Sequence, residues 1–323
     1  MKTKRYLIID ALNMYFRAYI VDPSLSHNGQ PIGGVKGFLK ILQKLVRETK
    51  PDFIVVAWDG PGGSARKRIV NKSYKEGRKP IRLNRDIQGM LNENQELENK
   101  IWQQTRLVEY LNKLPIAQIM LPGVEADDVI AQIVGMPGLK GHQKIIVSSD
   151  KDFIQLCDDS TVLFRPIQKE VLNKKNILEK FNIHPSNFAM ARAIAGDKSD
   201  NLPGVPGVGL KSVAKKLDFL AEDEECTLED ISDFCKDQNE SKLKIYTSIL
   251  EHMSLIRDNY KIMQLYTPSI PIDGKRTIRQ SIHQFDCSFN KTEVLKMMNE
   301  DGFGAFDWSS LWQVSQHLIY ENC

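Results

Sequence analysis

Four short apolar runs along this chain predict buried β-strands, and the segments between them show helical spacing. The runs span residues 6–9, 53–58, 116–121 and 145–147. Between the first two, apolar residues recur every three or four positions over 35–46, which predicts an amphipathic helix. Strands that alternate with helices form largely parallel sheets with helices on both faces. The expected fold class is therefore α/β, with a mostly parallel central sheet.

Aspartates follow the carboxyl ends of three of these runs. Asp10 ends the first run, Asp59 the second, and Asp150 and Asp152 follow the fourth. One aspartate after a strand is ordinary turn chemistry. In open parallel sheets, however, ligands bind beyond the carboxyl ends of the strands. We therefore expect these carboxylates to converge on one edge of the sheet.

A denser group of acids lies in Gly-Val-Glu-Ala-Asp-Asp, residues 123–128, ahead of a further apolar segment. The helix dipole favours acids in a first turn, so a capping role is one interpretation. Three carboxylates in four positions exceed what a cap needs, and hard cations such as Mg²⁺ and Mn²⁺ prefer such ligands. On a helix, Glu125 and Asp128 would share a face, with Asp127 beside them. A metal site is therefore preferred.

The alternation is interrupted by residues 64–99, whose first half is strongly basic and has little apolar periodicity. A solvated charge run is one interpretation; phosphate binding is preferred, because almost no acid lies among these bases before Asp86. Tyr74, beside Lys75, is expected to offer a stacking face to an unpaired base. The basic residues are Arg66, Lys67, Arg68, Lys72, Lys75, Arg78, Lys79, Arg82 and Arg85.

A third motif, within residues 193–217, combines three glycines in six residues with a basic segment. Backbone N–H groups near Gly204, Gly207 and Gly209 can face a phosphate with no side chain in the way. The residues that follow include Lys211, Lys215 and Lys216. A plain helix–turn–helix connection would not need these features, so we expect a hairpin that grips a duplex backbone without reading bases. Asp197 and Asp200, just upstream, add two carboxylates.

Composition narrows the class of protein. The formal net charge is only +3 over 323 residues, so nucleic-acid affinity must come from local patches. The cysteines form no CxxC pair, which favours reduced thiols and argues against zinc. No apolar run approaches the ~20 residues of a membrane span, and no signal-peptide pattern precedes the first strand. A soluble, cytoplasmic protein is expected.

Three regions are expected along the chain: an α/β core over 1–180 with a basic insertion at about 64–100, a duplex-binding region over 181–245, and a helical region over 246–323. The last region carries no chemical signature. Its aromatic and apolar residues are expected to pack as a small helical subdomain, with a partner-binding surface as the alternative. These residues are Phe303, Phe306, Trp308, Leu311 and Trp312.

Taken together, the motifs resemble the 5′-nuclease superfamily, which includes bacteriophage flap endonucleases and the 5′–3′ exonuclease domain of bacterial DNA polymerase I. The similarity covers about residues 5–220, in the family's order. It rests on Leu-Ile-Ile-Asp10, Val-Val-Ala-Trp-Asp59, Tyr74-Lys75 with Arg78, Gly123-Val-Glu-Ala-Asp-Asp128, Ser-Ser-Asp150-Lys-Asp152 and Gly196-Asp-Lys-Ser-Asp-Asn201 with its glycine hairpin. The resemblance implies a PIN-like, resolvase-like core with an arch insertion and a helix–three-turn–helix.

The resemblance also implies two Mg²⁺ ions, with Mn²⁺ as a substitute, and a K⁺ ion at the glycine hairpin. The implied catalytic residues are Lys75 and Arg78, at the base of the arch, with Asp10, Asp150 and Asp152. The implied ligands nearer the first ion are Asp10, Asp59, Glu125 and Asp127. Those nearer the second are Asp150, Asp152, Asp197 and Asp200, and Asp128 belongs to the same acid set.

The implied activity is a two-metal hydrolysis that removes 5′ flaps, RNA primers or 5′-terminal nucleotides from duplex DNA in replication or repair, with RNase H activity included. A monomer is expected, with a single-strand DNA-binding protein or a replication complex as partner. Two alternatives are a catalytically silent DNA-binding protein and a PIN-like single-strand ribonuclease. The intact acid set argues against the first, and the duplex-gripping hairpin against the second.

The chain departs from the family's pattern in three places. Arg66 and Lys67 stand where the family usually has Phe-Arg. The segment between Arg78 and Gly123 is longer than in the polymerase domain, which affects the shape of the arch. A different C-terminal region takes the place of the polymerase, so a free-standing, phage-type enzyme is expected, in the host cytoplasm if a phage encodes it.

Overall fold

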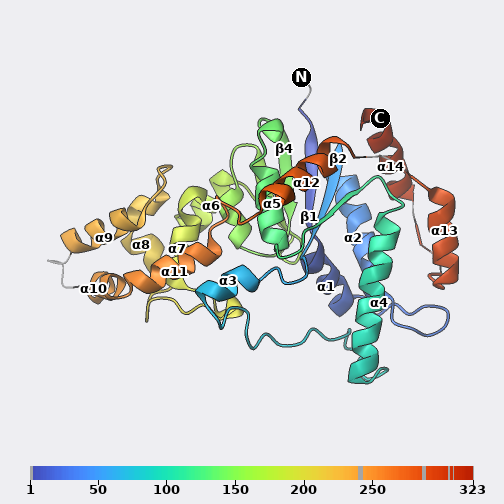
Figure 1. Cartoon of the computed structure of the whole chain (residues 1–323), viewed down its shortest axis with the longest axis horizontal. Coiled ribbons are helices and arrows are strands. Elements are labelled where there is room, and N and C mark those ends of the chain that lie inside the picture. Colours follow the sequence, from blue (N-terminus) through green and yellow to red (C-terminus); the bar gives the residue numbers. More distant parts are fainter. Residues whose placement is uncertain (1–2, 239–242, 286–288, 305, 308, 323) are drawn as a thin grey trace.

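The computed structural model describes residues 3–238, 243–285, 289–304, 306–307 and 309–322 (Figure 1). Trp308 lies outside these residues, as does the side chain of Leu311. Within the described part of the chain, none of the helices combines the length and apolar character needed to cross a membrane.

A six-stranded sheet forms the centre of the molecule, in the order β3-β2-β1-β4-β5-β6. Its first five strands are parallel and β6 pairs antiparallel with β5. The predicted α/β class and the four predicted strands are confirmed, whereas β5 and β6 were not expected. The bounds are β1 Arg5–Asp10, β2 Phe53–Trp58, β3 Ala117–Met120, β4 Gln143–Val147, β5 Thr161–Arg165 and β6 Glu170–Leu172.

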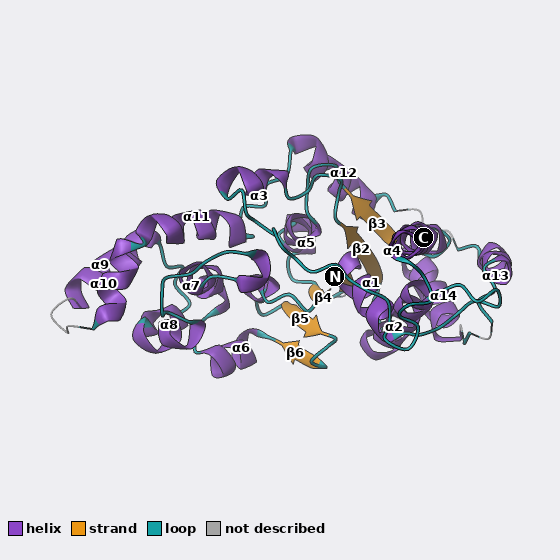
Figure 2. Cartoon of the chain, turned by 90° about the horizontal axis from the view of Figure 1, so that it is seen from below, coloured by secondary structure: helices purple, strands orange, loops and turns teal. Residues whose placement is uncertain are grey.

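Alternation of side chains along β1 divides the core into two layers. Leu7 and Ile9 face one cluster, and Tyr6 and Ile8 face the other, as expected for successive strand residues. The first cluster lies against α1 (Ala11–Val21), α2 (Gly33–Thr49) and α4 (Glu93–Leu111). The second lies against α5 (Ala126–Val134) and the helices that follow it. Figure 2 shows α5 and α2 on opposite sides of the sheet.

The insertion begins with the short helix α3 (Ala65–Val70) and continues to α4 through residues 71–92, which form turns but no helix or strand. This segment passes below the carboxyl edge of the sheet in Figure 1. Its far end is fixed to α4, because the Leu83 N–H donates to Glu96 (2.8 Å) and Lys100 donates to the Ile81 carbonyl (2.9 Å). The segment therefore spans the carboxyl edge and is held at both ends.

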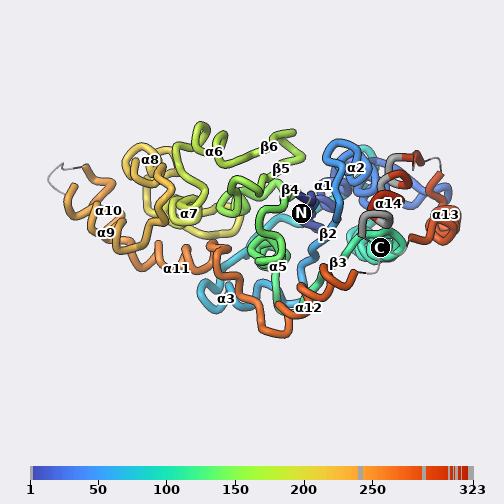
Figure 3. Tube along the Cα trace, turned by 90° about the horizontal axis from the view of Figure 1, so that it is seen from above, coloured from blue at the N-terminus to red at the C-terminus, as the bar shows by residue number. Residues whose placement is uncertain are grey.

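Short helices extend the molecule to one side of the sheet (Figure 3). Buried Asn259 on α11 ties the glycine hairpin to α7, since its amide donates to the carbonyls of Ala193 (3.0 Å) and Pro203 (2.8 Å). The bounds are α6 Lys174–Phe181, α7 Phe188–Ala195, α8 Leu210–Lys216, α9 Leu228–Asp237, α10 Lys244–Glu251 and α11 Met253–Met263. Short 3₁₀ turns lie at Pro137–Leu139, Asp152–Leu156, Pro185–Asn187, Lys198–Asp200 and Asp218–Ala221.

The C-terminal helices return across the core instead of forming a separate unit. α12 (Ile272–His283) packs on α5 and β3, and α14 (Ser309–Asn322) packs on α2. Between α13 (Lys291–Glu300) and α14, Phe303 is buried against Tyr110 of α4, with ring centroids 5.5 Å apart. Phe303 therefore does not pack within the expected small helical subdomain; it completes the core layer over α2 and α4.

Candidate active site

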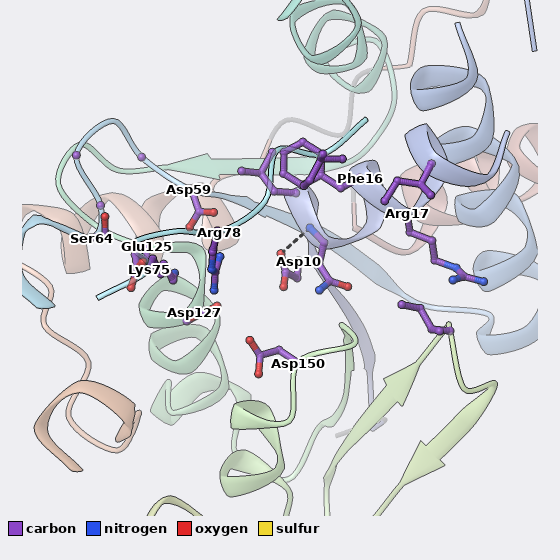
Figure 4. Close-up of a pocket in the computed structure, with 18 residues that line it drawn as sticks. Asp10, Phe16, Arg17, Asp59, Ser64, Lys75, Arg78, Glu125, Asp127 and Asp150 are labelled. Carbon is purple, nitrogen blue, oxygen red and sulfur yellow. Dashed lines mark hydrogen bonds and ion pairs between the residues drawn. The ribbon is translucent and has the colours of Figure 1, made fainter. Parts of the chain in front are cut away.

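A pocket of about 620 Å³ lies beyond the carboxyl ends of β1, β2 and β4 (Figure 4). It brings together carboxylates from four separated parts of the sequence, as the positions after the strands predicted. Lys75 and Arg78 of the insertion line the same pocket. Its carboxylates are Asp10, Asp59, Glu125, Asp127 and Asp150.

Asp10 is buried at the point where β1 ends and α1 begins. Its carboxylate accepts hydrogen bonds from the Ser148 hydroxyl (2.8 Å) and the Asn13 N–H (3.2 Å). The Asn13 side chain in turn accepts from the Ser149 N–H (2.9 Å), which joins the ends of β1 and β4. Burial, with the nearby charges of Asp59 and Asp150, raises the pKa of Asp10 to about 7. Such a site favours added positive charge.

Asp59 and Glu125 connect β2 to the start of α5. The Asp59 carboxylate accepts from the N–H of Ala126 (2.8 Å), the first residue of α5. Glu125 accepts from Lys67 (2.7 Å) and Lys75 (2.5 Å). Burial opposes its charged form, but the two ammonium groups keep the pKa of Glu125 below its ordinary value. Glu125 is therefore an anion held by two cations of the insertion.

The expected shared face of Glu125 and Asp128 is wrong. Glu125 precedes the helix and has extended backbone angles (φ −78°, ψ 154°), so its side chain does not follow the helical spacing. Asp127 lines the pocket instead, and burial, together with the charges of Asp150 and Asp10, raises its pKa. Asp128 does not line the pocket; its carboxylate accepts from the Ser269 N–H (3.1 Å) in the segment between α11 and α12.

Of the carboxylates described so far, Asp10, Asp59, Glu125 and Asp127 form a first group. The remaining ones, Asp150, Asp152, Asp197 and Asp200, form a second group at the side of the pocket. Asp150 accepts from the N–H of Asp152 (2.9 Å), and burial, with the charge of Asp150, raises the pKa of Asp152 to about 7. Arg192 of α7 binds Asp152 (3.1 Å) and also Asp197. Of this group only Asp150 lines the pocket. No pattern in the sequence predicted that an arginine joins two of these acids.

The base of the insertion is fixed between the two carboxylate groups. Lys75 has a left-handed backbone (φ 59°) and its N–H donates to the Asp200 carbonyl (3.0 Å). Arg78 binds the Asp200 carboxylate, and Asn201 donates to the Ser73 carbonyl (3.0 Å). Because Lys75 also binds Glu125, it bridges the first group to the loop that carries the second.

Lys67 and Arg66 have different partners, although they are adjacent in sequence. Lys67 lies in the first carboxylate group, 2.7 Å from Glu125 and 4.0 Å from Asp127. Arg66 donates to the Ser269 carbonyl (2.7 Å) and hydroxyl (2.9 Å). In the described structure, Arg66 is thus engaged in a contact between α3 and the C-terminal segment, and Lys67 is the one at the site.

The expected stacking role of Tyr74 is wrong. Its side chain is only 2% exposed and belongs to the core, so its ring offers no stacking face in this structure. The ammonium groups of Lys67 and Lys75 lie 5.8 and 5.0 Å from the ring centroid. Phe16 is the aromatic residue that lines the pocket, next to Arg17 (Figure 4). Helical spacing from Asp10 could have identified both, since Asn13, Phe16 and Arg17 fall on one side of α1.

The glycine hairpin has two kinds of glycine. A Cβ at Gly204 would overlap the backbone of Ala195 and Gly196, so this glycine permits a close backbone contact. Gly207 has a left-handed backbone (φ 75°), and a Cβ at Gly209 would meet nothing within 4 Å. Lys211 and Lys215 are exposed on the helix α8 that follows. The open side at Gly209 is compatible with the predicted approach of a phosphate.

Gly204→Ala is expected to lower the free energy of unfolding by roughly 1–3 kcal/mol or more, the usual range for overpacking. The backbone of Ala195 cannot move away as a flexible side chain could. Gly209→Ala is the matched control, with a change within about 0.5 kcal/mol because the new methyl group has free space. Urea unfolding of both variants measures the difference; equal stabilities would contradict the close contact.

The donor set fits hard divalent cations. Eight carboxylates gather on adjoining loops, and Asp10, Asp127 and Asp152 have pKa values raised by burial and by neighbouring acids. Oxygen ligands of this kind suit Mg²⁺ and Mn²⁺. As the described side chains stand, no three of the Asp, Glu, His or Cys residues are close enough to hold one ion. Lysine and arginine side chains bind several of these carboxylates instead.

Comparison with known proteins finds a family model and relatives that match this chain. Residues 5–182 match the family model described as the 5′–3′ exonuclease N-terminal resolvase-like domain. A 5′–3′ exonuclease of Aquifex aeolicus (strain VF5) is 30% identical over 218 residues, which cover 66% of this chain and 69% of that protein. A 5′–3′ exonuclease of Buchnera aphidicola subsp. Acyrthosiphon pisum is 28% identical over 299 residues, covering 91% of this chain and 97% of that protein.

The fold is also similar to a solved structure. That structure is a variant of the bacteriophage T5 flap endonuclease in a pseudo-enzyme–product complex with DNA and metal ions. The TM-score is 0.63 at 18% identity, and the match covers 97% of this chain and all of that one. The mostly parallel sheet with flanking helices is therefore shared with a known nuclease fold.

Proposed function

This chain belongs to the 5′–3′ exonuclease family, and we propose that within it the chain acts as a structure-specific 5′-nuclease on duplex DNA that carries a 5′ flap, a nick or an RNA primer. The family expected from the motifs is confirmed by the match over residues 5–182. Removal of RNA primers, and hence RNase H activity, is part of the proposal. A single-strand DNA-binding protein or a replication complex is the proposed partner of a monomeric enzyme.

One observation carries the proposal: Lys75 and Arg78 connect two groups of carboxylates at the carboxyl edge of the sheet. Lys75 binds Glu125 of the first group, and Arg78 binds Asp200 of the second. Both side chains line the pocket with Asp10 and Asp150. Hydrolysis of a phosphodiester needs negative ligands for metal ions and positive charge for the phosphate. This arrangement supplies both within one pocket.

The residues that would hold two divalent ions are Asp10, Asp59, Glu125 and Asp127 in the first group and Asp150, Asp152, Asp197 and Asp200 in the second. When bound, such ions supply activation of the attacking water and stabilisation of the leaving oxygen. We propose Mg²⁺ for this role, with Mn²⁺ as a substitute, because every donor is a carboxylate oxygen.

The chain's own residues supply position and charge. Ser148 and Asn13 hold the Asp10 carboxylate in place. Lys75 and Arg78 would donate to the scissile phosphate and stabilise the negative charge that grows on it during hydrolysis. The backbone near Gly207 and Gly209, where the structure leaves open space, would hold the duplex, with K⁺ as a candidate ion there. Products would carry a 5′-phosphate and a 3′-hydroxyl.

The experiment that tests this function uses duplex DNA with a 5′-labelled flap, incubated with the protein and either Mg²⁺ or EDTA. Release of an intact flap oligonucleotide only with Mg²⁺ is the expected result. Release of mononucleotides alone would retain the metal-dependent chemistry and make the enzyme chiefly an exonuclease. Tight binding of the flap substrate with no cleavage in either condition would contradict the proposal and favour a DNA-binding protein.

A further inference from the structure

Arg192 places a positive charge inside the second carboxylate group. Its guanidinium binds Asp152 at 3.1 Å through Nε and Asp197 through Nη2. All three side chains are largely buried, with 14–16% of their surface exposed. Charged hydrogen bonds of this kind are strong and directional, because the planar guanidinium presents its donors in a fixed geometry.

The origin of Arg192 distinguishes it from the other cations of the site. Lys67, Lys75 and Arg78 all reach the carboxylates from residues 65–78 of the insertion. Arg192 comes from α7 in the core, where its neighbours Ala191, Ala193 and Ile194 are buried. A movement of the insertion toward a substrate would take the first three charges away from the carboxylates. It would leave Arg192 where it is.

Arg192 also lies close in sequence to one of its partners. Asp197 follows it by five residues, just beyond the end of α7 at Ala195. Asp197 is further restrained by the N–H (2.7 Å) and the hydroxyl (2.6 Å) of Ser199, which both donate to it. The pair is therefore built into one short segment. A divalent ion that binds Asp197 and Asp152 must do so beside a fixed positive charge.

We propose that Arg192 is a resident cation that sets the affinity of the second carboxylate group for its divalent ion. This inference rests on the proposed function, which assigns Asp150, Asp152, Asp197 and Asp200 to that ion. Like charges a few ångströms apart repel even when protein and water screen them. Arg192 thus weakens the second ion relative to the first, and the group fills fully only when another anion, such as the phosphate of a substrate, joins it. Arg192 is a positioning residue and does not itself contact the reacting atoms.

The test measures Mn²⁺ binding to the full chain without DNA, by calorimetry and by electron paramagnetic resonance of the free ion. In Arg192→Met the weaker of the two ions is expected to bind at least about tenfold more tightly, which corresponds to about 1.4 kcal/mol. Arg192→Lys should stay close to the unmodified protein because the charge remains. Unchanged or weaker binding in Arg192→Met would overturn the proposal and leave Arg192 as a structural clamp.

Two controls keep the result interpretable. Thermal unfolding in EDTA establishes that Arg192→Met is folded, and Arg192→Gln, which keeps one hydrogen-bond donor, replaces it if it is not; the same tightening is expected. Asp197→Asn should weaken the second ion by removing a ligand. If the unmodified protein binds no Mn²⁺ at all, the proposed metal-dependent function fails. If it binds Mn²⁺ but Arg192→Met and Arg192→Gln show no tightening, only the present inference fails.

Discussion

Replacing Asp150 or Asp152 by asparagine is expected to abolish cleavage of flap DNA while duplex binding is retained. Asp150 lines the pocket, and its carboxylate is linked to the backbone of Asp152. Either change removes a negative ligand from the second group, and the loss in rate should be at least about 10² to 10³, the scale of removing one preorganised charge from an active site. The duplex should still be held at the glycine hairpin, which neither residue contacts.

The measurement compares single-turnover cleavage in Mg²⁺ with the dissociation constant for the same substrate in Ca²⁺. Asp159→Asn is the matched control, because Asp159 is an exposed aspartate just beyond the same region and outside the pocket. It should change neither quantity by more than about twofold, as expected for a surface substitution. Equal losses of cleavage and binding in Asp150→Asn would show that the acid site and the duplex site are not separable.

Lys75→Ala is expected to slow cleavage far more than it weakens binding, again by about 10² to 10³ in rate. Its ammonium group lies in the pocket and binds Glu125 at 2.5 Å, so its role is local charge at the phosphate and not general attraction of DNA. Glu125 keeps Lys67 as a partner in the variant, which limits the loss of stability.

Lys72→Ala provides the control for Lys75→Ala, since Lys72 is an exposed lysine of the same segment. Its removal should weaken binding slightly and more so at low salt, as expected for a solvent-exposed cation near a phosphate backbone. Single-turnover rates at saturating enzyme separate the two effects. If Lys75→Ala reaches the unmodified rate once enough protein is present, Lys75 contributes affinity alone.

Much of the fold could be predicted because each buried strand is marked by an apolar run within a short stretch of sequence. β1, β2 and β4 are buried on both faces and therefore appear as unbroken apolar runs. β5 and β6 were not predicted because they are only five and three residues long, and β5 merely alternates buried with half-buried positions. Such short alternation does not distinguish a strand from a loop.

The residues of the site could largely be predicted from the sequence, but the directions in which their side chains point could not. Asp10, Asp59 and Asp150 follow strand ends, so topology alone brings them together. Which of Asp127 and Asp128 faces the pocket depends on the residue at which α5 starts. A shift of that start by one residue would change which of the two faces the pocket. Tyr74 illustrates a second limit, since an aromatic residue beside lysines can be buried as easily as exposed. Arg192 shows a third, because its two partners lie five and forty residues away.

The packing of α14 on α2 has a consequence for how this protein is made. Val294, Phe303 and Leu318 fill part of the layer over α2, although about 250 or more residues separate them from it in sequence. Contacts between such distant parts of a chain form late, because a long loop must close first. During synthesis the first 182 residues would therefore leave the ribosome with an uncovered apolar face, which only the last helices can close. The catalytic region matched by the family model is in this sense not a complete folding unit.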